Sequence, residues 1–410
     1  MLNRQKSQPQ SFIALIENQP NLVPLLVVVT FVMMGIGILA PVLPLYAATF
    51  GVNTTLIGMT ITLFGVARLC VDIPAGSLIE RYGRRRFLWL GPATMAIASY
   101  IAALSSSFSV LLVCRFMQGI GSALYMTAAM VTITDLSSPS NRGRTMALYQ
   151  IALLLGTGLG PTIGGLAARW WGYAAPFWVF GVVASIGAFI ALFCLPETLG
   201  PKPATTGQRS KPFDLKAIQL LLSQQAFLLI IFVSFATFFT ASAAKFGLIP
   251  LIGNSRFQMD SDAIGLGLTI AAVANCLILP IAGTMMDRYG YKAVIVPAEL
   301  VCALTLLLFA WAPTSALFWL GMPLIGMTLG ICFPATAAYA VNITRQDQVG
   351  QVIGFLRAFS DLGFLLGPLA IGAISDLTPY RYAGGLCFNA ALIVVSTIPF
   401  LIWAKEHQKQ

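Results

Sequence analysis

The sequence predicts an all-α integral membrane protein, in which twelve transmembrane helices form two related six-helix halves. Three observations lead to this fold class. The 410 residues are 58% hydrophobic and only 9% charged, whereas soluble proteins have about 45–50% apolar and about 25% charged residues. The apolar residues form runs of membrane-spanning length, and landmark residues recur at one constant offset. So few charges suit a chain whose solvent is lipid.

The apolar runs are long enough to cross a bilayer, which takes about 20 residues of α-helix. Glycine and proline interrupt several runs, and transmembrane helices tolerate such breaks because neighbouring groups satisfy the freed backbone. We therefore expect helices over residues 22–46, 56–79, 87–105, 108–134, 145–168, 175–196, 222–250, 263–286, 293–312, 315–341, 350–374 and 382–404.

Lysine and arginine residues set the expected topology. One set of loops contains basic clusters such as Arg84–Arg86, while the other set contains only Arg169, Arg256 and Arg381. Because cytoplasmic loops carry the excess of basic residues, we expect both termini in the cytoplasm, as an even number of helices requires. The first run is too long for a signal peptide and should anchor the chain uncleaved. We expect the inner (plasma) membrane of a bacterium.

The net charge of +10 does not indicate nucleic-acid binding, because the basic residues lie in short loops and form no continuous face. The single histidine, His407, lies in a polar tail. The seven cysteines lie within apolar runs and none form a CxxC pair, so we interpret them as core residues and expect no metal site.

An internal repeat divides the chain. The segment GSLIERYGRR (76–85) resembles GTMMDRYGYK (283–292), at an offset of 207 residues. The same offset relates Gly160–Pro161 to Gly367–Pro368. Duplicated halves are common in secondary transporters. We expect an N-terminal half (1–196), a flexible cytoplasmic linker (197–217) and a C-terminal half (218–410).

The loop between the second and third runs carries the first motif. Gly76 allows helices to approach closely, and Gly83 allows a tight turn. Glu80 can face the N-terminus of a helix in the other half, for which we expect the eleventh. The arginines can pair with Asp135 at the end of the fourth run, in addition to fixing topology. The motif comprises Gly76, Glu80, Arg81, Gly83 and Arg84, and its second copy supplies Asp287 and Arg288.

Two further motifs lie inside membrane runs. The fourth run contains Arg115 and Gln118 in the pattern RxxQGxG. A buried arginine is costly, so Arg115 should face a cavity or a partner, or else anchor neighbouring backbone by hydrogen bonds. The fifth run has a smooth glycine face that can form a tight, gating seam with the other half, or simply allow close packing. Its motif comprises Gly156, Gly160, Pro161, Gly164 and Gly165.

These motifs resemble those of the major facilitator superfamily, and within it the drug:proton antiporters, over nearly the whole chain. The resemblance implies the major facilitator fold, transport by alternating access, a role for Arg115 in proton transfer, and export, for which the glycine motif is typical. Glu80 stands where the family usually has aspartate. The first run lacks the acidic residue that many relatives carry there, which argues against a cationic substrate.

Four charged residues form two pairs with a spacing of four, Arg68 with Asp72 and Arg357 with Asp361. This spacing places both members on one helix face. In the fold that the chain resembles, the second and eleventh helices meet between the halves. Crossed pairs, Asp72–Arg357 and Arg68–Asp361, can then hold the cytoplasmic side closed. The alternative is two local pairs within single helices.

Two more charges lie inside expected helices. Lys245 can bind an anionic group of a substrate or extend to the membrane surface. Glu299 lies in the ninth run, which is usually peripheral, so it should extend to the surface or pack against a polar neighbour. Our candidates for the substrate cavity are Met34, Gln118, Tyr125, Phe238, Lys245 and Phe333.

Together the residues and the resemblance indicate a monomeric secondary active transporter that exports small amphiphilic or drug-like compounds, with protons as the coupling ion and no cofactor. The alternative is a metabolite carrier or a lipid or lysolipid flippase on the same scaffold. The chain has no nucleophile–base constellation, metal-ligand set or GxxxxGK[ST] loop, so we do not expect an enzyme or an ATP-driven pump. The expected partners are a small-molecule substrate and membrane lipids.

Overall fold

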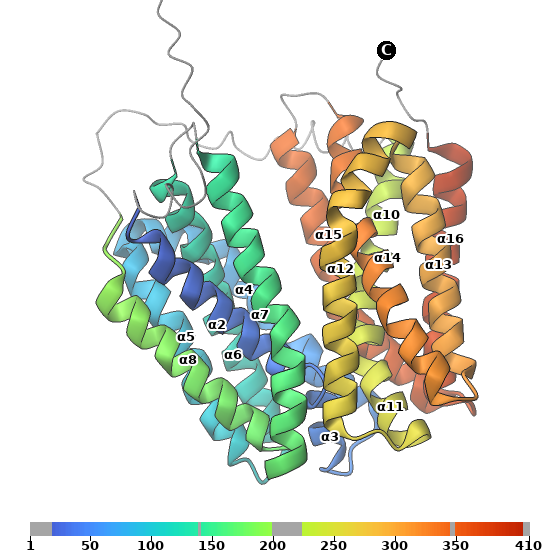
Figure 1. Cartoon of the computed structure of the whole chain (residues 1–410), viewed down its shortest axis with the longest axis horizontal. Coiled ribbons are helices and arrows are strands. Elements are labelled where there is room, and N and C mark those ends of the chain that lie inside the picture. Colours follow the sequence, from blue (N-terminus) through green and yellow to red (C-terminus); the bar gives the residue numbers. More distant parts are fainter. Residues whose placement is uncertain (1–18, 138–140, 199–223, 345–348, 405–410) are drawn as a thin grey trace, which may run out of the picture.

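The computed structural model describes residues 19–137, 141–198, 224–344 and 349–404, and within these ranges the chain forms helices and no strands. The helices stand side by side in two bundles (Figure 1). The predicted linker lies mostly outside the described residues. Its first two residues, Glu197 and Thr198, are described and bind to the N-terminal half.

The first bundle contains all helices before the linker. Its first membrane run is broken between Leu39 and Leu43, where Pro41 has no N–H to continue a helix. The helices are α2 (Leu22–Leu39), α3 (Leu43–Ala48), α4 (Thr54–Tyr82), α5 (Arg84–Ala103), α6 (Phe108–Leu136), α7 (Arg142–Trp171) and α8 (Ala175–Cys194).

The second bundle contains the remaining helices. Its first span runs from Gln225 to Phe257, beyond the predicted end at residue 250, and includes a π-helix, η1. The elements are α10 (Gln225–Thr240), η1 (Ala241–Leu248), α11 (Ile249–Phe257), α12 (Ser261–Tyr289), α13 (Tyr291–Trp311), α14 (Ser315–Asn342), α15 (Val349–Leu377) and α16 (Tyr382–Trp403).

Each of the twelve predicted runs corresponds to a helix or a helix series of the described chain. Eleven of these are long and apolar enough to cross a membrane by length and composition. The other is α5, which begins with three arginines that lower its mean hydropathy. It packs between α6 and α8 inside the N-terminal bundle, so the expected fold class is confirmed.

The internal repeat extends to the helix boundaries. An offset of 207 residues relates the first residues of α4 and α12, Thr54 and Ser261. The same offset relates the first residues of α5 and α13, of α6 and α14, of α7 and α15, and of α8 and α16. The halves are therefore two copies of one helical arrangement.

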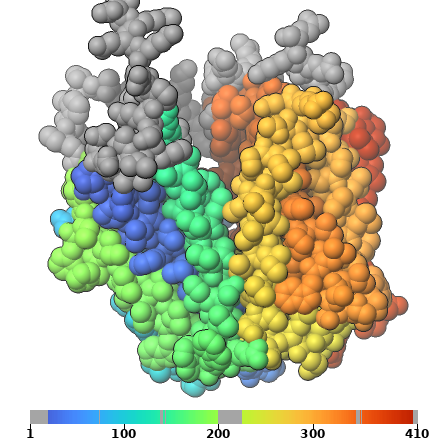
Figure 2. Space-filling model, viewed as in Figure 1, coloured from blue at the N-terminus to red at the C-terminus, as the bar shows by residue number. Residues whose placement is uncertain are grey.

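The two bundles converge at the end of the molecule opposite to that where α2 begins and α16 ends (Figure 1). At this closed end, a Cβ atom on Gly58 of α4 would overlap the carbonyl oxygen of Pro368 of α15. A Cβ atom on its repeat equivalent, Gly265 of α12, would likewise overlap the carbonyl oxygen of Pro161 of α7. We call these two contacts, α4 with α15 and α7 with α12, the closed-end seams; Figure 2 shows the second at the surface.

Polar groups fasten both seams. The carboxylate of Asp376 accepts hydrogen bonds from the backbone N–H groups of Thr54 and Thr55, at 3.0 and 2.8 Å, where α4 begins. At the equivalent place of the other seam, Arg169 forms an ion pair with Asp262, at 2.5 Å, near the start of α12. Asp376 follows Arg169 by 207 residues, so the same position carries opposite charges in the two halves.

The opposite end of the molecule is open. A Cβ atom on Gly76 of α4, Gly283 of α12 or Gly354 of α15 would have no other heavy atom within 4 Å. The expectation that Gly76 lets helices approach closely is therefore wrong for this conformation, because the bundles are separated at this end. Glycines are tightly packed at the closed end and free at the open end.

We predict that Gly58→Val and Gly265→Val shift the protein away from the conformation seen here. A branched side chain cannot fit beside a carbonyl oxygen that already touches the glycine backbone. A single cysteine replacing Leu69, which is 37% exposed and lines the cavity described below, should then react several-fold more slowly with a bulky maleimide added at the open end.

Gly354→Val is the matched control, because its added side chain meets open space in this conformation. It should leave the labelling rate from the open end unchanged or raise it. Unchanged labelling in Gly58→Val and Gly265→Val would show that the seams do not control which end is closed.

Candidate functional site

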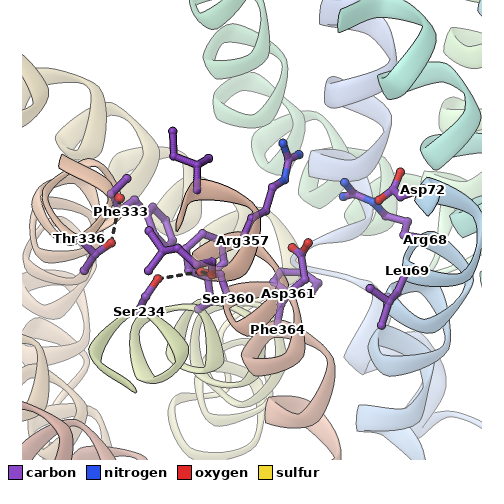
Figure 3. A pocket seen from close by; sticks show the side chains of 15 residues that line it. Arg68, Leu69, Asp72, Ser234, Phe333, Thr336, Arg357, Ser360, Asp361 and Phe364 are labelled. Carbon is purple, nitrogen blue, oxygen red and sulfur yellow. Dashed lines mark hydrogen bonds between the residues drawn. The ribbon is translucent and has the colours of Figure 1, made fainter. Parts of the chain in front are cut away.

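A cavity of about 450 Å³ lies between the two halves. Charged side chains line the wall formed by α4 and part of the wall formed by α15, while hydroxyl and aromatic groups line the wall formed by α10 and α14 (Figure 3). The lining residues are Gly65, Arg68, Leu69, Asp72, Ser234, Phe238, Phe333, Thr336, Ala337, Ile353, Leu356, Arg357, Ser360, Asp361 and Phe364.

The four spaced charges all reach this cavity. Arg68 and Asp72 project from α4, and Arg357 and Asp361 project from α15 on the opposite side (Figure 3). Within the described residues, no two of them form an ion pair at 4 Å or less. Asp361 interacts electrostatically with Arg68 across the cavity as well as with Arg357 on its own helix. Neither the crossed nor the local pairs are formed here, so the crossed pairs stay a prediction for another conformation.

The facing wall combines polar and aromatic groups. The hydroxyl groups of Ser234 (α10) and Ser360 (α15) are hydrogen-bonded at 2.7 Å, and the rings of Phe238 (α10) and Phe333 (α14) lie 4.6 Å apart. Both phenylalanines are among the predicted cavity residues. Ser234, Thr336 and Ser360 were missed, although Ser234 precedes Phe238 by one helical turn and therefore shares its face.

Four other predicted cavity residues do not line this cavity; the fourth, Lys245, is described below. Gln118 is fully buried in the N-terminal bundle and donates to the hydroxyl of Ser99 at 2.8 Å. Tyr125 is also fully buried and packs against α5 at Gly91. Met34 lies on α2, where its backbone packs against α7. These predictions were wrong because aromatic and polar residues in a membrane helix can face the core of their own bundle.

Arg115 is held inside the N-terminal bundle, 6% exposed. Its guanidinium donates to the carbonyl oxygen of Thr60 at 3.1 Å and to the side-chain oxygen of Gln118 at 2.6 Å. It also lies over the ring of Phe64, 4.7 Å from the centroid. Within the described residues it has no acidic partner. The geometry favours the alternative in which Arg115 anchors neighbouring backbone.

The glycine motif of α7 is divided between two neighbours. Cβ atoms on Gly156, Gly160 and Gly164 would overlap the backbone of α2, which belongs to the same half. Only Pro161 and Gly165 contact α12 of the other half, at the closed-end seam. The expected seam between the halves is thus formed by part of the motif, and the main glycine face packs within its own bundle.

The loop motif forms a network at the open end. Arg84 forms the expected ion pair with Asp135, at 2.6 Å. The carboxylate of Glu197 accepts hydrogen bonds from the backbone N–H groups of Arg84 and Arg85, at 2.9 and 3.2 Å. A carboxylate at this place stabilises the N-terminus of α5. Glu197 was missed, although it stands directly after the sixth run in the segment LPET.

Other members of the loop motif make no such contacts. Glu80 is exposed, and within the described residues it forms no ion pair. Its expected contact with the eleventh helix is absent, because α4 and α15 are separated at this end. Arg81 and the second-copy residues Asp287 and Arg288 are also exposed.

Lys245 and Glu299 occupy contrasting places in the C-terminal bundle. Lys245 is half-buried in η1, faces Cys276 of α12 and has no acidic side chain within 4 Å in the described residues. A π-helix is rare and often marks a functional site. Glu299 is 1% exposed and accepts a hydrogen bond from Thr237. It therefore does not extend to the membrane surface, because its side chain points into the bundle.

Sequence comparison identifies similar proteins along most of the chain. Multidrug resistance protein 2 of Bacillus subtilis is 24% identical over 361 residues, which are 86% of this chain and 88% of that protein. Quinolone resistance protein NorA of Staphylococcus aureus is 23% identical over 372 residues, 89% of this chain and 93% of that protein. Among solved structures, a mutant of the nucleoside transporter NupG superposes with a TM-score of 0.80 at 14% identity, covering 94% of this chain and all of that one.

The family described as Major Facilitator Superfamily matches residues 25–260 and 237–410. These two matches together include both bundles and the cavity between them. With its multiple membrane-spanning helices, the protein is a transporter rather than an enzyme, and the chain belongs to the Major Facilitator Superfamily.

Proposed function

We propose that the protein is a proton-coupled exporter of small amphiphilic compounds that works by alternating access. The observation that carries this proposal is the cavity between the halves, in which two acids and two arginines face each other without forming ion pairs. Ionisable residues at membrane depth are costly and mark ion or substrate pathways. The likeness to two drug-resistance proteins supports export.

The open end is assigned to the cytoplasm. The basic cluster Arg84–Arg86 lies there, and basic residues are retained on the cytoplasmic side of membranes. Both termini are then cytoplasmic, and the structure represents the inward-open state. We propose the inner membrane of a bacterium as its location, and a monomer that needs no cofactor besides protons.

The lining favours an amphiphilic substrate with an anionic group. Phe238 and Phe333 offer apolar contact area. The positive charges of the cavity itself are Arg68 and Arg357, which form no ion pair with Asp72 or Asp361. Lys245 lies outside the lining residues, on η1, and adds a positive charge with no acidic partner among the described residues. The charged groups of the cavity, Arg68, Asp72, Arg357 and Asp361, can also bind a polar metabolite, so a metabolite carrier is the second candidate.

The charges of α4 and α15 suit a switch. In the outward-open state these helices approach at the cytoplasmic end, and Asp72–Arg357 and Arg68–Asp361 form crossed pairs. Protonation of either acid weakens its pair and favours the inward-open state. Breaking one buried pair costs roughly 3–5 kcal/mol, and moving an equilibrium from 1:99 to 99:1 takes about 5.5 kcal/mol. The free energy of one or two such pairs is therefore large enough to switch the carrier between its two conformations.

Proton coupling is tested in proteoliposomes with a panel that includes norfloxacin, a fluorescent amphiphile with a carboxylate. We expect an imposed pH gradient to drive uphill substrate movement, accompanied by proton movement in the opposite direction. Dissipating the pH gradient and the membrane potential together should abolish the uphill movement of the substrate. Uphill movement that survives this treatment would contradict the proposal.

The crossed pairs are tested by charge exchange. Asp72→Asn should bias the carrier toward the inward-open state and strongly reduce uphill transport, because one pair is lost. Combining Asp72→Arg with Arg357→Asp should restore part of the activity, because the pair is kept with its charges reversed.

A cross-link gives an independent measurement. Cysteines placed at positions 72 and 357, in a background without native cysteines, should join only when the cytoplasmic end is closed. If the two cysteines form no cross-link in any condition, the crossed pairs are wrong. The charges then form only pairs within single helices.

A further inference from the structure

Glu299 lies in the middle of α13 with its carboxyl group inside the C-terminal bundle. The hydroxyl of Thr237 on α10 lies 2.5 Å from one oxygen of this carboxyl group, and the thiol of Cys332 on α14 interacts with it. Both partners are neutral. Glu299 is the only acidic residue of the described ranges whose side chain is buried.

The elements around Glu299 bring no positive charge to it. α13 packs against α12, α14 and α16, and it reaches α10 through Thr237. The titratable groups that interact with the carboxyl are Cys302 on α13 itself and Cys332 on α14. Within the described residues no lysine, arginine or histidine lies within 4 Å. A carboxylate with no cationic partner is unfavourable in such a place.

The hydroxyl of Thr237 can serve either protonation state of the carboxyl. It lies 2.9 Å from the carbonyl oxygen of Val233 and 2.5 Å from an oxygen of Glu299. A hydroxyl has one proton to donate and two lone pairs to accept. When it donates to Val233, Glu299 must carry a proton and donate to Thr237. When Glu299 is ionised, the hydroxyl rotates and donates to the carboxylate.

The partners of Glu299 belong to the helical turns that line the cavity. Thr237 stands next to Phe238, and Cys332 stands next to Phe333, and these two rings pack together at the cavity wall. One turn away from each partner, Ser234 and Thr336 also line the cavity. Glu299 therefore lies directly behind the wall that contacts the substrate in our proposed function.

We propose that Glu299 is a proton-binding site of the C-terminal half, located behind the Phe238–Phe333 wall and connected to the cavity through Thr237 and Cys332. One proton from cavity water binds one carboxylate oxygen. Later in the transport cycle the same proton is released to water on the other side of the membrane. The proposal rests on the proposed proton coupling for its role in transport, but proton binding itself can be measured without any substrate.

The first test is infrared difference spectroscopy of the whole protein in lipid nanodiscs during a pH titration. The wild type should show the carbonyl stretching band of a buried protonated carboxylic acid, which disappears as pH rises. The band should be absent in Glu299→Gln and shifted in frequency in Glu299→Asp. Thr305→Val is the matched control, because it removes another buried polar group of α13 and keeps the carboxyl; it should retain the band.

A band that is unchanged in Glu299→Gln, or a wild-type spectrum with no such band over the pH range in which the protein stays folded, would overturn the proposal. If Glu299→Gln does not fold, the frequency shift of the band in Glu299→Asp tests the assignment. Only a band that comes from the carboxyl group at position 299 should shift in this variant.

The second test separates proton binding from transport. In proteoliposomes with norfloxacin as the probe, Glu299→Gln should lose substrate-driven proton movement down to the background leak, while Glu299→Asp and Thr305→Val keep it. A wild type that shows the infrared band and moves norfloxacin without any proton movement would reject proton coupling and keep the proton site. A Glu299→Gln variant with wild-type proton movement would reject the coupling role of Glu299.

Discussion

The close approach of backbone to backbone at the closed-end seams is the constraint on which the rest of the structure depends. Gly58 against Pro368 and Gly265 against Pro161 leave no space for a side chain. Because the bundles are held together at this end, they diverge toward the other, which opens the cavity and separates the open-end parts of α4 and α15. The lack of ion pairs across the cavity and the exposure of Glu80 both follow from this geometry.

Membrane depth makes each ionisable side chain costly, and the protein meets this cost in three different ways. Arg115 uses neutral acceptors, a backbone carbonyl and the side chain of Gln118, in the core of one bundle. The charges of α4 and α15 border a cavity that water can fill. Glu299 is enclosed by a hydroxyl and a thiol, an environment that a neutral carboxylic acid fits better than a carboxylate.

The sequence predicts the helices well and their neighbours less well. Hydrophobic length and the offset of 207 residues identify the spans and the duplication, because both are properties of the chain read in order. Which face of a helix meets the cavity depends on packing between segments far apart in the chain. For this reason Phe238 and Phe333 were placed correctly, whereas Gln118 and Tyr125 belong to the bundle core. The cap by Glu197 joins residues more than a hundred positions apart and has no local signal.

The two closed-end seams are held by different polar contacts at equivalent positions of the duplicated halves. Asp376 binds backbone N–H groups at the start of α4, while Arg169 binds the side chain of Asp262 near the start of α12. Dissolved salt screens exposed ion pairs over about 8 Å at physiological ionic strength, and Arg169 is half exposed. Two copies of one helical arrangement therefore meet through a salt-sensitive ion pair at the seam of α7 with α12 and through backbone hydrogen bonds at the seam of α4 with α15.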